Sequence, residues 1–154
     1  MKFKRPYKDI NDTLQHIRVQ IAAGIPWTQE NAPTFDNAAA CYYWLMDRTT
    51  YRHDPPDTEL LQSIDTLLTS RNYWHKPGAG DCDCFVIAWL TLFNCSNIKG
   101  RAWIKLAGRS KKYPVHIWAG VDDNGRELAA DLTQRKFNSE RAYPYIQKIY
   151  FKPL

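Results

Sequence analysis

The sequence lacks any apolar stretch long enough to cross a membrane. Its longest apolar run, residues 84–93, falls well short of the roughly 20 residues that a bilayer requires. The opening residues, MKFKRPYKDIND, are charged and lack the apolar segment of a secretory signal. These two absences predict a protein without a membrane partner and favour a cytoplasmic location.

Cysteine is also scarce. The four cysteines, Cys41, Cys82, Cys84 and Cys95, have neither the density of a disulfide scaffold nor the paired spacing of a zinc site. Two residues along a helix rotate by about 200°, so ligands drawn from residues 81–84 would spread around a helix axis. We therefore expect cytosolic thiols, no metal and no other cofactor.

The composition is that of an ordinary globular chain, with 44% hydrophobic and 24% charged residues. A length of 154 residues suits one domain, 1–154, with its own core. The net charge of +5 is concentrated in residues 99–154, which hold 12 Lys and Arg against 5 Asp and Glu. Because no nucleic-acid-binding motif accompanies this charge, we interpret it as a solvated basic face and rank nucleic acid low among partners.

Helical periodicity dominates the first part of the chain. Gly24 and Pro26 are expected to end the first helix, and Asp36 is expected to cap the second. The last helix is apolar nearly all round, which is typical of a helix buried at the centre of a domain. The predicted helices span residues 8–23, 37–48, 58–70 and 82–95.

After residue 100 the pattern changes to short apolar or alternating segments, which predict strands. The sequence Asp-Asp-Asn-Gly at 122–125 predicts a hairpin between the second and third of them. Helices followed by strands indicate an α+β fold with an antiparallel sheet. The predicted strands span residues 101–108, 115–121, 126–133 and 145–151.

Cys82 has the features of a catalytic nucleophile. Glycines in GAGDCDCF (78–85) allow a sharp turn, and Asp81 as N-cap would place Cys82 in the first turn of the central helix. There the helix dipole and free N–H groups stabilise a thiolate and an oxyanion. Cys84 points to nearly the opposite side, and we expect the other three cysteines to be small buried side chains. The charges of Asp81 and Asp83 act against the thiolate.

A thiol nucleophile needs a base, and His116 is the best candidate. It lies within a predicted strand in an apolar context, where an idle imidazole would be costly. His16 lies on the polar side of its predicted helix, and His53 lies in a loop. His75 also lies in a loop, seven residues before Cys82, and is a candidate for the rim or the oxyanion side of the site.

The hairpin supplies the third member of the site. A two-residue turn would place His116 opposite Thr133, whereas a four-residue loop would place it opposite Asp131. In either register His116 and Asp131 share one face of the sheet, so Asp131 can orient the imidazole. Because Cys82 has to meet the imidazole, we expect the central helix to cover that face, with Trp118 on it and Ile117 on the other.

Three short motifs in this order resemble the transglutaminase-like superfamily: GDC with a following acid at 80–83, HIW at 116–118 and ADLT at 130–133. The upstream sequence YRHDPPDTELLQS (51–63) is similar to compact phage- and prophage-borne members. Such members often read GDCDD, whereas this chain has Cys84 at the last position. The resemblance covers about residues 36–133, which leaves a helical extension at 1–35 and a final strand region at 134–154.

The resemblance implies a papain-like core, with Cys82 at the start of a central helix and with His116 and Asp131 on adjacent strands. These three residues match the family's catalytic positions. An upstream aromatic residue, here Trp74 or Tyr73, often assists the oxyanion hole in relatives.

The implied activity is acyl transfer on a peptide or protein substrate through a thioester. Hydrolysis is favoured over transamidation because small microbial relatives are more similar to peptidases. The alternative is a structural or assembly component of a phage particle that keeps the fold with an idle triad and contacts other phage proteins. Either reading places the chain in a bacterial host cytoplasm or on a virion.

Overall fold

The computed structural model describes residues 2–3, 10–56 and 58–152, and it has the expected α+β class. No helix among these residues is long and apolar enough to cross a membrane. The helices are α1 (Ile10–Asn31), α2 (Ala38–Met46), α3 (Ile64–Leu68) and α4 (Cys82–Asn94). The strands are β1 (Lys2–Phe3), β2 (Thr50–Tyr51), β3 (Glu59–Leu60), β4 (Ala79–Gly80), β5 (Arg101–Gly108), β6 (Pro114–Asp123), β7 (Arg126–Ala130) and β8 (Tyr145–Tyr150).

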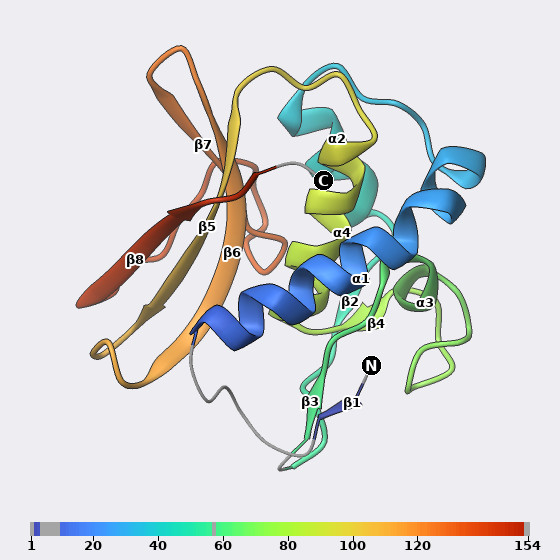
Figure 1. Cartoon of the computed structure of the whole chain (residues 1–154), viewed down its shortest axis with the longest axis horizontal. Helices are drawn as coiled ribbons and strands as arrows, with labels where there is room; N and C mark the ends of the chain where they lie inside the picture. Colours follow the sequence, from blue (N-terminus) through green and yellow to red (C-terminus); the bar gives the residue numbers. More distant parts are fainter. Residues whose placement is uncertain (1, 4–9, 57, 153–154) are drawn as a thin grey trace.

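The last four strands form one antiparallel sheet in the order β7-β6-β5-β8, with the helices on one side of it (Figure 1). The central helix α4 is buried along almost its whole length. It contacts the sheet through β6 and contacts α1, α2 and α3 with its other sides. This surrounding explains why its sequence is apolar nearly all round.

The two faces of the sheet carry separate apolar clusters. Ile104, Leu106 and Ile117 belong to the main core with the helices. Trp103 and Trp118 lie on the opposite, outer face, where they form a second cluster with two alanines and Tyr143. Successive side chains of a strand point to opposite faces, so burial on both sides gives the continuous apolar runs seen in the sequence.

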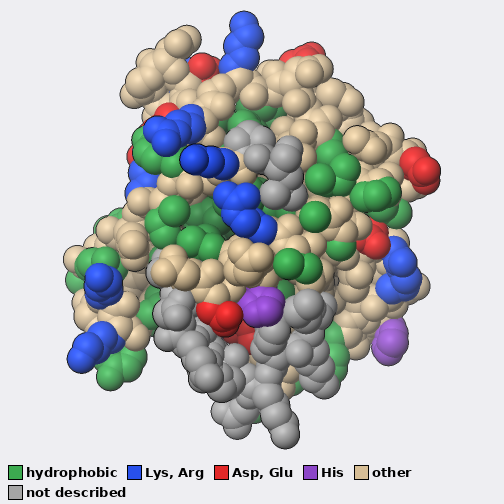
Figure 2. Space-filling model, viewed as in Figure 1, with side chains coloured by type: hydrophobic (Ala, Val, Ile, Leu, Met, Phe, Trp, Pro, Cys, Tyr) green, Lys and Arg blue, Asp and Glu red, His purple; other side chains and the backbone are tan. Residues whose placement is uncertain are grey.

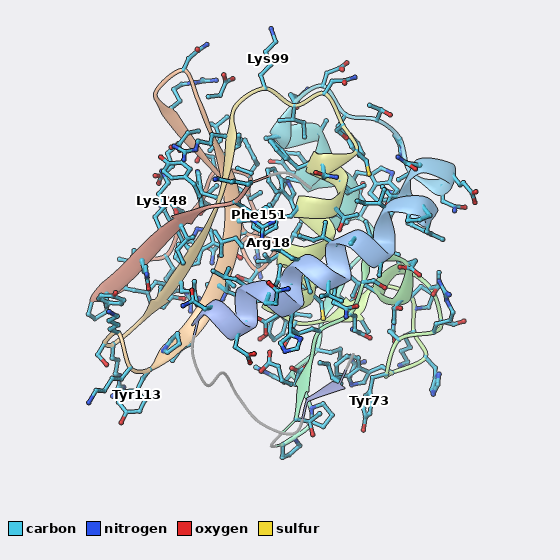
Figure 3. All side chains as sticks on the ribbon, in the orientation of Figure 1. Arg18, Tyr73, Lys99, Tyr113, Lys148 and Phe151 are labelled. Carbon is cyan, nitrogen blue, oxygen red and sulfur yellow. The ribbon has the colours of Figure 1, made fainter. Side chains whose placement is uncertain are left out.

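Charged side chains cover the outer cluster. Lys105, only 8% exposed, forms ion pairs with Glu127 and Glu140. Lys148, labelled in Figure 3, pairs with Asp122 at 2.9 Å and with Glu127 at 2.8 Å. Part of the basic charge of the second half is therefore neutralised within the fold. Figure 2 shows several Lys and Arg side chains grouped toward the upper left of the viewed face, with others spread singly around it.

The prediction that Gly24 and Pro26 end the first helix is wrong, because α1 runs through both to Asn31. Gly24 is the point where α1 lies against α3. A Cβ there would come within 2.7 Å of Ile64 Cγ2, so glycine permits the contact. The Thr28 hydroxyl donates to the Gly24 carbonyl at 2.8 Å. Tertiary packing therefore outweighs the low helix propensity of these two residues.

Other predicted boundaries also shift. Asn37, not Asp36, caps α2, because its side chain accepts a hydrogen bond from Ala40 N at 2.8 Å. The helix predicted over 58–70 shrinks to α3, since its first residues form β3 and pair with β1 instead. The third strand of the sheet ends at Ala130 rather than at 133.

Phe151 continues the chain just beyond β8 and ties it to the first helix. Its backbone N–H donates to Ala102 O at 2.8 Å, and the Arg18 guanidinium lies 4.4 Å from its ring centroid (Figure 3). Arg18 extends from α1, so this contact joins an early helix to the end of the sheet.

Candidate active site

Cys82 is the first residue of α4, directly after the short strand β4. Strand β4 pairs in parallel with β2, so that Tyr51 lies opposite Gly80. A Cβ on Gly80 would come within 2.7 Å of Leu67 Cδ1, so only glycine allows this approach. Asp81 occupies the N-cap position as predicted, but its side chain makes no capping hydrogen bond. The first turn of α4 therefore starts without the side-chain cap that the sequence suggested.

His116 and Asp131 form a hydrogen-bonded pair. The imidazole Nε2 donates to Asp131 Oδ2 at 2.7 Å, and the two side chains are only 11% and 3% exposed. His116 is the third residue of β6, beside a bulge that shifts the pairing with β5 after Ala107. Asp131 follows directly after β7. A carboxylate in this position fixes both the tautomer and the orientation of the ring.

The hairpin register explains this pairing. Asp123 faces Arg126 across a two-residue turn in which Asn124 and Gly125 have φ values of 51° and 78°. Of the two registers that the sequence left open, the two-residue turn is correct. The paired residues end at Ala119 with Ala130, and this register continued by one residue puts Asp131 opposite Trp118 and diagonal to His116.

Thr133 also holds the carboxylate of Asp131. Its hydroxyl donates to Asp131 Oδ1 at 2.7 Å, and its backbone N–H donates to the same oxygen at 3.0 Å. The hydroxyl oxygen lies 3.3 Å from His116 Nε2. One carboxylate oxygen is thus bound by Thr133 while the other receives the imidazole.

Aromatic rings hold the imidazole plane. His116 stacks on Trp118 with centroids 5.2 Å apart at an angle of 23°, and Tyr143 stacks on Trp118 at 5.9 Å. The Trp118 indole N–H donates to Glu140 Oε2 at 2.8 Å. Trp118 therefore shares a face with His116 and packs beside it, as predicted.

The prediction that α4 covers this same face is wrong. Ile117 belongs to the core with the helices, whereas Trp118 belongs to the outer cluster. The thiol and the imidazole can still approach each other because His116 lies near the beginning of β6, at the edge of the region that α4 covers. There the Cys82 sulfur is close enough to the strand backbone to receive a hydrogen bond from Ile117 N–H. The site thus lies at the end of the sheet, not on the face under the helix.

A cavity of about 180 Å³ is lined by both Cys82 and His116, together with Tyr51, Leu106 and Val115 among others. Among the described residues no hydrogen bond joins the Cys82 thiol to the imidazole. Since Nε2 is bound to Asp131, Nδ1 is the nitrogen left for the thiol.

A second, larger cavity of about 510 Å³ also uses His116, Tyr51 and Val115. Arg141 and Tyr143 lie on its wall, and it contains no carboxylate residue, in contrast to the smaller cavity. The imidazole therefore contributes to the walls of both cavities.

Burial raises the pKa of the Cys82 thiol well above its ordinary value, and the neighbouring charges of Asp83 and Asp81 raise it further. The hydrogen bond from Ile117 acts in the opposite direction but is outweighed. The thiol is therefore protonated at neutral pH in the unliganded protein. Burial, together with the two acids expected from the sequence to act against the thiolate, therefore keeps the proton on Cys82.

We expect the rate of Cys82 alkylation by iodoacetamide to rise with pH through pH 9 without a plateau near neutrality. Only the thiolate reacts, and its fraction keeps growing until the pH passes the raised pKa. The rate is measured by peptide mapping with EDTA present. Cys84 and Cys41 are fully buried and should react more slowly than Cys82 at every pH. A Cys82 rate already constant at pH 7 would show a pre-formed thiolate and contradict the expectation.

The other cysteines follow the sequence interpretation with one exception. Cys41 and Cys84 are buried, and the Cys84 thiol donates to Leu60 O at 3.3 Å. Cys95, at the end of α4, is only partly buried, because the chain leaves the core at this point.

Three residues were expected at the rim or on the oxyanion side of the site: Trp74, His75 and Trp118. None of them lines the two cavities, although Trp118 stacks on His116. Trp74 packs edge-to-face against Tyr73 with centroids 5.2 Å apart, and His75 is exposed in a turn with a φ of 54°.

Sequence reasoning missed an acidic cluster beside Cys82. Asp54, Glu59, Asp81 and Asp83 each bring one carboxylate oxygen into a group whose atoms lie within 4.8 Å of one another. Burial raises the pKa of Glu59 to about 10 and that of Asp81 to about 9, and the neighbouring carboxylates add to both shifts. The sequence gives no signal for this cluster, because Asp54 and Glu59 come from segments far from Cys82 along the chain.

Comparison with models of known protein families gives no match, and comparison with curated proteins gives none either.

Proposed function

We propose that this protein is a cysteine-dependent acyl-transfer enzyme whose nucleophile is Cys82, whose base is His116 and whose orienting residue is Asp131. The observation that carries the proposal is the 2.7 Å bond from His116 Nε2 to Asp131 beside a cavity that Cys82 also lines. A buried imidazole held by a carboxylate, with its other nitrogen available, is the arrangement that activates a thiol.

In the proposed reaction, Cys82 Sγ attacks the carbonyl carbon of a bound peptide or protein substrate. The thiol proton passes to His116 Nδ1 as the S–C bond forms, and Asp131 stabilises the imidazolium. The C–N bond then breaks, and His116 returns the proton to the leaving amine. Because the resting thiol is protonated, this proton transfer has to accompany the attack.

The backbone N–H groups of the first turn of α4 are the donors we assign to the oxyanion. They have no partners within the helix, and the helix dipole favours negative charge at this end. The Asp81 side chain makes no capping bond that would compete for the same role. The larger cavity beyond His116 is the region we assign to the substrate chain.

Water would complete a peptidase reaction by cleaving the Cys82 thioester, with His116 now acting on the water. We favour this outcome over transfer to an amine on the strength of the resemblance to small microbial relatives. That resemblance, through residues 51–63 and the GDC motif, is also what supports a papain-like core, a phage or prophage context, and a place in the host cytoplasm or on the virion.

A second candidate is a scaffold or assembly protein of a phage particle with an idle triad. The specific observation in its favour is the raised pKa of Cys82, caused by burial and by Asp83 and Asp81. An idle thiol has no need of a lowered pKa, so selection would tolerate these neighbours.

The two candidates differ in how the chain reacts with an activated ester. We expect p-nitrophenyl acetate to acetylate Cys82 with release of p-nitrophenol, and the thioester to be found by acid quenching and peptide mapping. In His116→Ala this acetylation should fall to the level of the other cysteines, because the base is gone. Equally slow acetylation of all four cysteines would favour the scaffold instead.

A further inference from the structure

The acidic cluster of Asp54, Glu59, Asp81 and Asp83 is assembled by three separate parts of the chain. Asp54 follows β2, Glu59 lies on β3, and the other two flank Cys82 at the start of α4. Asp81 and Asp83 are only 7% and 3% exposed, and the other two are partly buried. Four carboxyl groups held this close away from bulk water repel one another when they ionise, which together with burial raises the pKa of Glu59 and Asp81, and a bound cation would relieve this repulsion.

Two oxygen atoms of the cluster are buried without a hydrogen-bond donor. Asp81 Oδ1 and Asp54 Oδ1 are both inaccessible to solvent and accept no hydrogen bond from a donor outside the cluster, in which the two carboxyl groups face each other. The second oxygen of Asp54 accepts a bond from Leu60 N at 2.9 Å, which fixes the carboxylate in place. A buried carboxylate oxygen normally has a partner, and here the unsatisfied atoms belong to residues of one oxygen-rich group.

We propose that this cluster is a binding site for a divalent cation, and specifically for Ca²⁺. All the ligands are carboxylate oxygens, which suit a hard cation. Oxygens on opposite sides of an ion are separated by up to twice the metal–oxygen distance, about 4.6–5.2 Å for Ca²⁺ and about 4.0–4.2 Å for Mg²⁺. The cluster offers four carboxyl groups within 4.8 Å of one another, whereas Mg²⁺ usually binds through one or two carboxylates and keeps several waters, so Ca²⁺ is the better fit.

A bound cation would fasten the segment carrying Asp54 and Glu59 onto the start of α4. This segment is also held by the short pairings of β2 with β4 and β1 with β3, and by the Cys84 thiol, which donates to Leu60 O. Glu59, Asp81 and Asp83 line the same cavity as Cys82, but the proposal does not rest on any activity of the chain. Its tests can therefore succeed or fail independently of the proposed enzyme.

The test is the thermal unfolding of the full chain in EDTA and in millimolar Ca²⁺. A cation that binds only the folded state raises the unfolding midpoint, by about 5 °C or more when its concentration is about 100 times its dissociation constant. We expect such a rise for the wild type and little or none for Glu59→Gln and Asp54→Asn. In EDTA both variants should unfold no earlier than the wild type, because each exchange keeps the shape of the side chain and reduces the crowding of acidic groups.

Glu30→Gln is the matched control, because Glu30 is an exposed carboxylate on α1 outside the cluster. It should keep the full Ca²⁺ effect. Isothermal titration with Ca²⁺ should show one site in the wild type and in this control. An unchanged midpoint and no binding heat for the wild type, or an equal rise in Glu59→Gln, would overturn the proposal. An equal rise with Mg²⁺ would overturn the assignment to Ca²⁺.

Discussion

Replacing Cys82 with alanine is expected to abolish acyl transfer, with a loss of about 10⁵-fold or more in the turnover of p-nitrophenyl acetate. Without the sulfur no thioester forms, and the His116 imidazole that remains in the cavity is a much weaker nucleophile than the thiol that it activates. The release of p-nitrophenol is followed by absorbance, and circular dichroism verifies that the variant is folded. Removal of a partly buried sulfur at the start of α4 leaves the core side chains in place.

Cys95→Ala is the matched control for that experiment. Cys95 is the other partly buried cysteine and lies at the opposite end of α4, so its loss should leave turnover unchanged. A Cys82→Ala protein with wild-type turnover would end the enzymatic proposal. The alternative function, a scaffold or assembly protein with an idle triad, would then be favoured.

The second large effect is expected at the base and its partner. His116→Ala should reduce turnover about as much as Cys82→Ala, because residues that act as one unit do not contribute additively. Asp131→Asn should keep a trace, with a loss of about 10⁴-fold, since the asparagine still occupies the site but no longer selects the right tautomer. The kcat of each variant is measured under single-turnover conditions, so that acylation is observed directly.

His16→Ala serves as the control for loss of an imidazole. His16 lies on α1 and is paired with Asp12, remote from β6 in sequence and outside both cavities. Its loss should not change turnover. A larger loss in Asp131→Asn than in His116→Ala would contradict the assigned roles and point to a reaction in which Asp131 acts directly.

The three candidate catalytic residues could be predicted from the sequence, because the patterns that point to them are local. Glycines before Cys82 and an apolar run after it predict a turn into a buried helix, and α4 begins at Cys82. The Asn124-Gly125 pair predicts a hairpin, and strict alternation in strands then makes His116 and Asp131 share a face in either even-length loop. Because the two side chains share a face, they can form the hydrogen bond that the structure shows.

Features that depend on contacts between residues far apart in the sequence could not be predicted from it. Pro26 and Gly24 read as helix terminators, yet α1 continues because Gly24 lies against Ile64 of another helix. The face of the sheet that α4 covers was predicted wrongly for a similar reason. The alternation of side chains along paired strands fixes which residues share a face of the sheet. Only packing decides which of the two faces contacts the helices.

The sequence by itself determined the α+β class, the position of Cys82 at a helix start and the partnership of His116 with Asp131, because each depends on neighbours along the chain or on the period of a strand. Only the tertiary structure decided that Cys82 and His116 line one cavity at the end of the sheet. It alone also brought Asp54 and Glu59 to the acids that flank Cys82. Such gatherings depend on how separate elements pack in three dimensions, and no local pattern of residue types encodes that packing.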